Sequence, residues 1–270
     1  NRNPEQAEAL MRNLVKEKLT NGDKTIGAFL QMMSPVSAEI LSQSGFDWLI
    51  VDLEQAPGDF ATLPAQLQAM NGSGVVPFAR APWNDEVAIK RLLDTGVMGV
   101  LVPYVNSRHE AEAAVAACKY PPRGVRGVAG SPRAAGYTGN AAEYLASANA
   151  EIYVMIAVEP TEAVVNLDEI LRIPDLDGIF IGPMDLASSM GHLGNPNHPD
   201  AQVQIEIIER KVLASDKFLG TVATTADKAK HCFDIAYQWL VLIQDGAALV
   251  QAGRSKVTEF RNQYGSGDHE

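Results

Sequence analysis

Short apolar runs alternate with amphipathic segments along most of this chain of 270 residues. A short continuous apolar run bounded by turn residues predicts a strand that is buried on both faces, whereas apolar residues at helical spacing predict a helix. Eight runs predict strands, and they lie at Thr25–Leu30, Asp47–Val51, Val75–Arg80, Val97–Val102, Ile152–Val158, Gly178–Ile181, Phe218–Ala223 and Trp239–Ile243.

Segments with helical spacing precede, separate and follow these runs. A lead-in helix is predicted over Asn3–Leu19, where Asn21-Gly22 closes it. The stretch from Tyr120 to Asn149 is irregular apart from a short helix near Ala141–Asn149. The remaining helices are predicted at Ser37–Ser44, Phe60–Met70, Asp85–Thr95, Ser107–Cys118, Thr161–Ile173, Ala201–Ala214, Thr225–Ala236 and from near Asp245 toward Tyr264.

This alternation predicts the fold class α/β with a parallel sheet. Eight units in a chain of this length predict a closed (β/α)8 TIM barrel. An open doubly wound sheet is the alternative, but no Gly-x-Gly-x-x-Gly turn follows the first predicted strand. We therefore expect residues 1–270 to form one barrel domain, with an N-terminal helical extension over residues 1–20 and a disordered tail over residues 265–270.

Composition and charge narrow the classes of function. Thirty-three acidic and 22 basic residues give a formal charge of −11, which disfavours nucleic acid as a partner because phosphate binding requires clustered Lys and Arg. No apolar stretch has the length of a membrane span and residues 1–18 carry no apolar signal region, so we expect a cytoplasmic protein without a membrane partner. Cys118 and Cys232 lie in helical patterns and predict buried thiols rather than a disulfide.

One local cluster of basic residues stands out from this acidic background. Arg123, Arg126 and Arg133 lie in a loop rich in Gly and Pro. They could hold an anionic substrate or pair with surface acids, and both interpretations remain open.

Two predicted strands end in carboxylates. Glu159 follows the strand Ile152–Val158, and Asp185 follows Gly178–Ile181 through Gly182-Pro183. Parallel strands joined by a right-handed crossover bring their carboxyl ends to one edge of the sheet, so the two side chains are expected to lie close together. The alternative is a pair of solvated loop acids.

Other polar residues follow the remaining strands and define a rim without histidine; they are Asp52, Glu54, Gln55, Arg80, Tyr104 and Asp245. Oxygen ligands suit Mg²⁺ or Mn²⁺ better than zinc, which prefers His and Cys. A zinc role for His192 and His198, in the loop after Asp185, is a second hypothesis. Arg80 could pair with Asp52 or Glu54, or its guanidinium could hold a substrate carboxylate, as an α-keto acid would supply.

Motifs along most of the chain resemble those of the HpcH/HpaI aldolases. They are Asp52-x-Glu54-x-Ala56-Pro57, Arg80-x-Pro82-x-Asn84-Asp85, Lys90-Arg91-Leu92-Leu93-Asp94-x-Gly96, Tyr120-Pro121-Pro122-x-Gly124-x-Arg126-Gly127, Glu159 and Gly182-Pro183-x-Asp185-Leu186. The family comprises metal-dependent class II pyruvate aldolases, including those for 2-keto-3-deoxy sugar acids and 4-hydroxy-2-oxo-heptanedioate. The related macrophomate synthase decarboxylates oxaloacetate.

The resemblance implies specific roles for residues of this sequence. Glu159 and Asp185 match the metal ligands, for Mg²⁺ or Mn²⁺ with Co²⁺ as a further candidate, and Arg80 matches the ligand of the pyruvate carboxylate. Asp94 matches an acid that approaches the site of a neighbouring subunit, and Asp52 matches a partner in proton transfer. Gly182, Pro183 and Met184 fall in the substrate-binding segment. The resemblance also implies a hexamer whose C-terminal helix is exchanged between subunits.

Three positions differ from the family pattern. Gln55 stands where the family has the histidine that transfers protons with Asp52, Ala157 stands in place of a glutamine, and Met184 in place of a small residue. We expect a lyase that cleaves or forms a 4-hydroxy-2-oxo acid, with pyruvate as the enolate component and an aldehyde as the partner. The alternatives are a decarboxylase of oxaloacetate-like acids and a non-catalytic keto-acid-binding paralogue.

Overall fold

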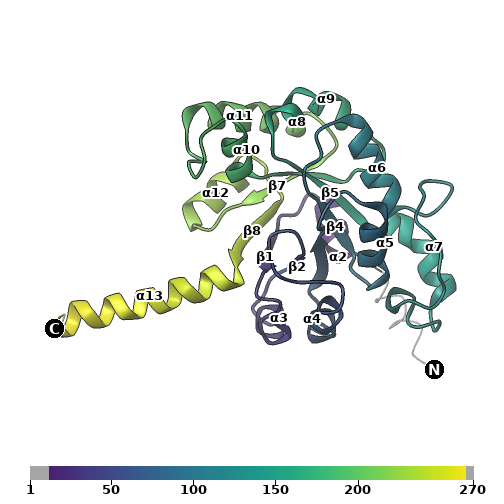
Figure 1. The fold of residues 1–270 in the computed structure, drawn as a ribbon, viewed down its shortest axis with the longest axis horizontal. Coiled ribbons are helices and arrows are strands. Elements are labelled where there is room, and N and C mark those ends of the chain that lie inside the picture. The colour runs from purple at the N-terminus through teal and green to yellow at the C-terminus, as the bar shows by residue number, and fades with distance from the viewer. Residues whose placement is uncertain (1–11, 266–270) are drawn as a thin grey trace.

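The computed structural model describes residues 12–265, which contain a closed barrel of eight parallel strands in sequential order (Figure 1). This confirms the predicted (β/α)8 fold. Seven predicted strands agree with the structure within a residue or so at each end, whereas β4 begins at Gly99 rather than Val97. The strands are β1 Thr25–Leu30, β2 Trp48–Asp52, β3 Val76–Arg80, β4 Gly99–Val102, β5 Tyr153–Val158, β6 Gly178–Ile181, β7 Phe218–Val222 and β8 Trp239–Gln244.

Helices surround the barrel, and most lie where the hydrophobic spacing predicts them. The structure has α2 Leu14–Thr20, α3 Pro35–Ser42, α4 Leu63–Ala69, α5 Glu86–Asp94, α6 Arg108–Cys118, η1 Arg133–Ala135, α7 Ala141–Glu151, α8 Thr161–Val165, α9 Leu167–Ile170, α10 Pro183–Ser189, α11 Pro199–Leu213, α12 Ala226–Asp234 and α13 Asp245–Tyr264. None of these helices is long and apolar enough to cross a membrane.

Two helix predictions are wrong in detail. The segment Thr161–Ile173 is not one helix but the short pair α8 and α9, which meet at Asn166. The Asn166 side chain donates a hydrogen bond to the Asn106 carbonyl oxygen at 2.8 Å, which ties the junction to another loop. The helix α10 was not predicted at all, because Gly182-Pro183 after the strand Gly178–Ile181 indicated a loop; Pro183 is instead the first residue of the helix, a position to which proline is well suited.

Large aromatic side chains fill the barrel interior. The rings of Trp48 and Trp239 stack with centroids 3.5 Å apart and both side chains are fully buried, with Phe78 packed against both. Gly27 provides the space for Trp48, since a Cβ at Gly27 would lie 2.2 Å from the indole. The interior is therefore a packed core and not a pore.

The helix α2 covers the amino-terminal end of the barrel. Val15 and Leu19 on α2 are buried in the same cluster as the interior aromatic residues. The Asn13 side chain caps α2 and also donates to the carbonyl oxygens of Met98 and Glu151, both at 2.9 Å. The predicted lead-in helix is confirmed over α2, and its residues 3–11 lie outside the described part of the chain.

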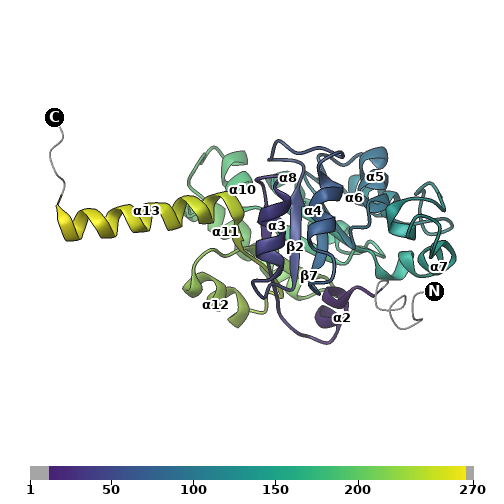
Figure 2. The same cartoon turned by 90° about the horizontal axis from the view of Figure 1, so that it is seen from below.

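At the other end of the chain, α13 extends away from the barrel as a single helix (Figures 1 and 2). Asp245, its first residue, is buried, whereas nearly all later side chains are exposed. The tail predicted over residues 265–270 lies outside the described part from residue 266 on.

Candidate metal and keto-acid site

The polar residues predicted at the rim meet at the carboxyl-terminal edge of the barrel. Asp52 and Arg80 end the neighbouring strands β2 and β3 and lie opposite each other in the strand register. Glu159 directly follows β5, and Asp185 lies in the first turn of α10, after the adjacent strand β6. The predicted common edge is therefore correct, although Asp185 is helical rather than in a loop.

Arg80 forms the centre of a buried ion-pair cluster. Its Nε donates to Asp52 Oδ1 at 2.8 Å and its Nη2 donates to Asp52 Oδ2 at 2.6 Å. Its Nη1 lies 3.0 Å from Glu54 Oε2. The side chain of Asp52 is fully buried and that of Arg80 is 11% exposed, so this bidentate pair is shielded from solvent. The pairing that the sequence analysis considered for Arg80 is present.

Asp52 has no free acceptor position to offer a substrate. Besides Arg80, its carboxylate accepts hydrogen bonds from the Gln31 side chain at 2.8 Å and from the backbone N–H groups of Glu54 and Gln55, both at 3.1 Å. Burial alone would raise the pKa of Asp52, but the hydrogen bond and charge of Arg80 lower it overall. Asp52 is therefore a fixed anion that orients Arg80.

Glu54 is less well satisfied than Asp52. Its Oε2 is buried and lies close to Arg80, yet it accepts no hydrogen bond from the described residues. Burial raises the pKa of Glu54, Arg80 opposes this, and the negative charges of Asp52 and Asp185 raise it further. A cation or a proton would relieve this arrangement.

Glu159 is the most strongly perturbed carboxylate of the cluster. It is 2% exposed, and burial together with the charges of Glu54 and Asp185 raises its pKa to about 7, although its Oε2 accepts the Tyr104 backbone N–H at 2.9 Å. Gly182 packs against it: a Cβ there would lie 2.9 Å from Glu159 Cγ and 3.2 Å from Oε1. The glycine keeps the space around the carboxylate open.

The donor set fits a hard divalent cation. Asp52, Glu54, Glu159 and Asp185 supply four carboxylates, whereas the cluster contains a single guanidinium, so negative charge exceeds positive charge. Carboxylate oxygens without imidazole or thiolate favour Mg²⁺ or Mn²⁺. Glu159 and Asp185 are the carboxylates that Arg80 does not contact, and they would hold such an ion.

The histidines proposed for zinc form a separate group in the loop between α10 and α11. Ligand atoms of His192, His198 and Asp200 lie within 4.8 Å of one another, and the two imidazole rings stack at 3.4 Å. His192 Nε2 lies 3.1 Å from Asp200 Oδ2, while His198 Nδ1 accepts the Asp200 backbone N–H at 3.2 Å. His198 Nδ1 therefore caps the first turn of α11. These contacts hold the loop between α10 and α11 together, and this structural role explains why the two histidines and Asp200 lie close to one another.

Several sequence-predicted residues lie away from the cluster or serve other contacts. The Gln55 side chain is exposed and interacts with the Glu54 carboxylate, while its backbone N–H donates to Asp52. Asp94 pairs with the buried Arg126 at 2.8 Å and does not join the cluster of its own chain. Asp245 accepts the backbone N–H of Gln31 at 2.8 Å and the Ser37 hydroxyl at 2.9 Å, so it connects the start of α13 to the loop after β1 and to α3.

The basic cluster in the long loop pairs within the protein. Arg123 forms an ion pair with Asp175, Arg126 pairs with Asp94, and Arg133 Nη1 donates to the Thr95 carbonyl oxygen at 2.7 Å. The predicted pairing with acids is therefore present for Arg123 and Arg126, although the Arg126 side chain is buried, whereas Arg133 binds a backbone carbonyl oxygen and, among the described residues, no acid. Sequence analysis missed Gln31, which follows β1 directly; its position at a strand end was the only available signal.

These features define a class of (β/α)8 enzymes with an acidic, arginine-containing rim, and comparison with known proteins identifies the family. The family model of the HpcH/HpaI aldolase/citrate lyase family matches residues 25–252. The chain is 42% identical over 219 residues to 5-keto-4-deoxy-D-glucarate aldolase of Escherichia coli, covering 81% of this chain and 85% of that protein. This chain therefore belongs to the HpcH/HpaI aldolase/citrate lyase family, and it is a lyase.

Solved structures agree with this assignment. An HpcH/HpaI aldolase/citrate lyase family protein from Burkholderia cenocepacia is 31% identical, covers 92% of this chain and 99% of its own, and has a TM-score of 0.88. The citrate lyase beta subunit of M. tuberculosis, solved with oxaloacetate and magnesium, shares the fold at 16% identity with a TM-score of 0.55, over 83% of this chain and 93% of its own.

Proposed function

We propose that this protein is a metal-dependent class II pyruvate aldolase, which cleaves or forms a 4-hydroxy-2-oxo acid with pyruvate as the enolate component. The observation that carries the proposal is the pair Glu159 and Asp185 at the ends of adjacent strands. Glu159 is buried beside other carboxylates with a pKa of about 7, as expected of a ligand whose charge a cation compensates. Mg²⁺ or Mn²⁺ are the proposed ions, with Co²⁺ as a further candidate.

The chain's own residues would bind and orient the keto acid. A bound divalent ion supplies Lewis acidity that stabilises an enolate. Arg80 would hold the keto-acid carboxylate with the N–H groups that Asp52 does not use, and Asp52 would keep the guanidinium plane fixed. Gly182 would leave room beside Glu159 for the substrate, and Pro183 and the 53% exposed Met184 would line the same segment.

Metal-dependent exchange of the methyl protons of pyruvate in D₂O tests the proposal. Glu159→Gln and Asp185→Asn should each abolish exchange, because neither amide can replace a charged oxygen ligand. Asp200→Asn is the matched control, since it removes a carboxylate outside the cluster. Loss of exchange in His192→Ala with retention in Glu159→Gln would refute this assignment of the metal.

A decarboxylase of oxaloacetate-like acids is the second candidate, and the absence of an evident base at Gln55 favours it. A carboxamide does not titrate near neutral pH and so cannot act as a general base, and the Asp52 carboxylate is fully engaged in hydrogen bonds. Loss of CO₂ generates the enolate without removal of a C–H proton.

The variant Gln55→His separates these two candidates. Imidazole titrates near neutrality, and a positioned general base contributes about 10²–10⁴-fold, so the variant should accelerate pyruvate proton exchange by about tenfold or more. Oxaloacetate decarboxylation should change far less. Gln55→Asn is the control. Coincident exchange rates and pH profiles for Gln55→His and the parent protein would show that Gln55 does not replace a needed base.

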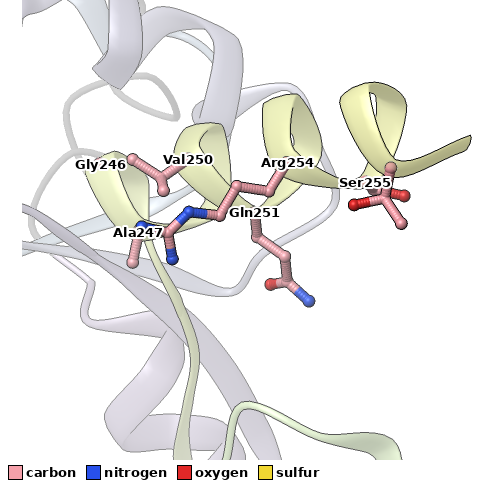
Figure 3. Close-up of a pocket in the computed structure, with 7 residues that line it drawn as sticks. Gly246, Ala247, Val250, Gln251, Arg254 and Ser255 are labelled. Carbon is pink, nitrogen blue, oxygen red and sulfur yellow. The ribbon is translucent and has the colours of Figure 1, made fainter. Parts of the chain in front are cut away.

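We also propose that the protein is a homo-oligomer, with a hexamer as the expected form. In this oligomer, α13 packs on another copy of the chain. A hollow of about 620 Å³ runs along α13 and is lined by Gly246, Ala247, Val250, Gln251, Arg254, Ser255 and Thr258 (Figure 3). Leu249, Phe260 and Tyr264 on the same helix are each at least 60% exposed. Most of the stability of a helix in a protein comes from tertiary packing of its apolar face, which supports a partner for α13.

A further inference from the structure

Two aromatic side chains form a stacked pair at the carboxyl-terminal edge of the barrel. Trp83 lies in the loop after β3, and Tyr104 lies two residues after β4. Their ring centroids are 5.6 Å apart with an interplanar angle of 26°. Trp83 is 56% exposed, so the pair presents an aromatic surface to solvent.

Tyr104 connects this pair directly to the carboxylate cluster. Its backbone N–H donates to Glu159 Oε2 at 2.9 Å, and its φ of 51° places a non-glycine residue in the left-handed region. Such a conformation costs energy and is retained where the surroundings require it. The hydrogen bond to Glu159 anchors Tyr104 at the carboxylate cluster, where burial and the charges of Asp185, Glu159 and Glu54 also raise the pKa of its phenol.

The backbone that carries Trp83 is also held in place. The Trp83 carbonyl oxygen accepts the Asp85 backbone N–H at 2.9 Å, and the Asn84 side chain donates to the Glu110 carbonyl oxygen at 2.9 Å. The indole therefore projects from an ordered loop. Its exposure contrasts with Trp48 and Trp239, which are fully buried in the barrel.

Packing within the chain does not account for Trp83. More than half of its surface contributes nothing to the core, whereas an exposed aromatic residue beside a binding site commonly contacts a ligand. Met184 adds a further exposed apolar side chain at the same edge, next to Asp185 in sequence. Trp83, Tyr104 and Met184 therefore place apolar and aromatic side chains after β3, β4 and β6, at the edge where the acidic cluster lies.

We propose that Trp83 and Tyr104 form the binding surface for an aromatic substituent on the aldehyde partner of the reaction. This inference rests on the proposed aldolase function and specifies its second substrate class. In the synthetic direction, the pyruvate methyl carbon loses a proton and bonds to the aldehyde carbon, and the aldehyde oxygen gains a proton. The substituent on the aldehyde carbon would stack on the indole, while the carboxylate of pyruvate lies at Arg80.

Competition between two aldehydes tests the inference. Initial rates of pyruvate addition to benzaldehyde and to glyceraldehyde give a ratio of kcat/KM values. The protein should favour benzaldehyde, and Trp83→Ala should lower the ratio by about 3- to 10-fold, as expected for the loss of one aromatic stack. Trp83→Phe should restore most of it. Tyr137→Ala, which removes an aromatic side chain that is 66% exposed elsewhere, is the control.

A binding measurement separates this inference from the proposed function. Trp83 is exposed while the other two tryptophans are fully buried, so quenching of fluorescence by acrylamide reports on Trp83 alone. Benzaldehyde should reduce this quenching, and glyceraldehyde at equal concentration should not. If benzaldehyde protects Trp83 from acrylamide but the protein does not exchange the methyl protons of pyruvate, the proposed aldolase function is rejected while the aromatic binding surface is retained. An unchanged aldehyde ratio in Trp83→Ala, or an indole already protected from acrylamide in the free oligomer, would overturn the inference.

Discussion

At the scale of single residues, the environment of Glu159 shows how the fold changes the chemistry of a side chain. An exposed glutamate is ionised at neutral pH, whereas burial and two neighbouring carboxylates raise the pKa of Glu159 to about 7. The proton and a divalent ion therefore compete for the same carboxylate. Metal affinity should rise as the pH increases through neutrality.

The same pKa shift predicts a pH-dependent stability of the metal-free protein. Because the pKa of Glu159 is higher in the folded than in the unfolded state, its contribution to stability is present below about pH 4.5 and is lost as the pH rises through about 7. Glu159→Gln should remove this loss. After chelation, the variant should match the parent protein near about pH 4.5 and exceed its free energy of unfolding by about 3 kcal/mol above about pH 8.

Urea denaturation at the two pH values measures this difference. Addition of Mg²⁺ should stabilise the parent protein and leave Glu159→Gln unaffected, since ligand binding stabilises only a protein that retains its site. A variant that is less stable than the parent at high pH would show that the Glu159 charge is compensated within the apo-protein.

At the scale of elements, contacts between strands depend on small residues opposite large ones. Gly27 on β1 lies opposite Trp48 on β2, whose indole stacks on Trp239 of β8. Gly99 on β4 meets Phe78 on β3 in the same way, since a Cβ would lie 2.1 Å from the phenyl ring. This alternation of small and large side chains lets the barrel close around its aromatic core.

Gly27→Ala should therefore destabilise the protein. The added Cβ would lie 2.2 Å from the Trp48 ring, which is fully buried and stacked and so cannot move aside; overpacking of this kind costs about 1–3 kcal/mol. Gly130→Ala, in the loop between α6 and η1, is the matched control. Its position is exposed and an added Cβ would lie 3.8 Å from Ala141 Cβ, an ordinary van der Waals contact, so the free energy of unfolding should change by at most about 0.5 kcal/mol. A clear loss of stability for Gly27→Ala beside little change for Gly130→Ala is expected in urea denaturation; a neutral Gly27→Ala would contradict this account of the core.

At the scale of the whole molecule, α13 is the helix that does not pack against the barrel along most of its length. It runs 20 residues from Asp245 and projects away from the other helices (Figure 2). Its exposed apolar residues Leu249, Val257, Phe260 and Tyr264 recur at helical spacing, which is typical of a helix that packs on one face. A second copy of the chain would bury this face.

Sedimentation velocity tests the proposed packing of α13. The double substitution Leu249→Lys and Phe260→Lys should shift the protein toward smaller species, because buried ammonium groups without partners are costly. Asn262→Lys adds a charge at an exposed polar position of the same helix and serves as the control. An unchanged distribution in the double variant would exclude α13 as the main contact between copies.

The sequence alone determined the order of the strands and most helices, the closed parallel barrel and the residues at its rim. These properties follow from local periodicity and from the geometry of parallel strands, which carries residues such as Asp52, Arg80 and Glu159 to one edge. The position of Asp185 in a helix escaped prediction, because proline at the start of α10 is equally typical of a rigid loop.

Only the tertiary structure decided how these residues interact. It showed that Asp52 is saturated by Arg80, Gln31 and backbone N–H groups, and that Glu159 is buried with a pKa of about 7. It also brought the Trp83 ring onto Tyr104. Burial, hydrogen-bond partners and ring contacts join residues distant in sequence, and they depend on the side-chain packing around each group, which no local pattern encodes.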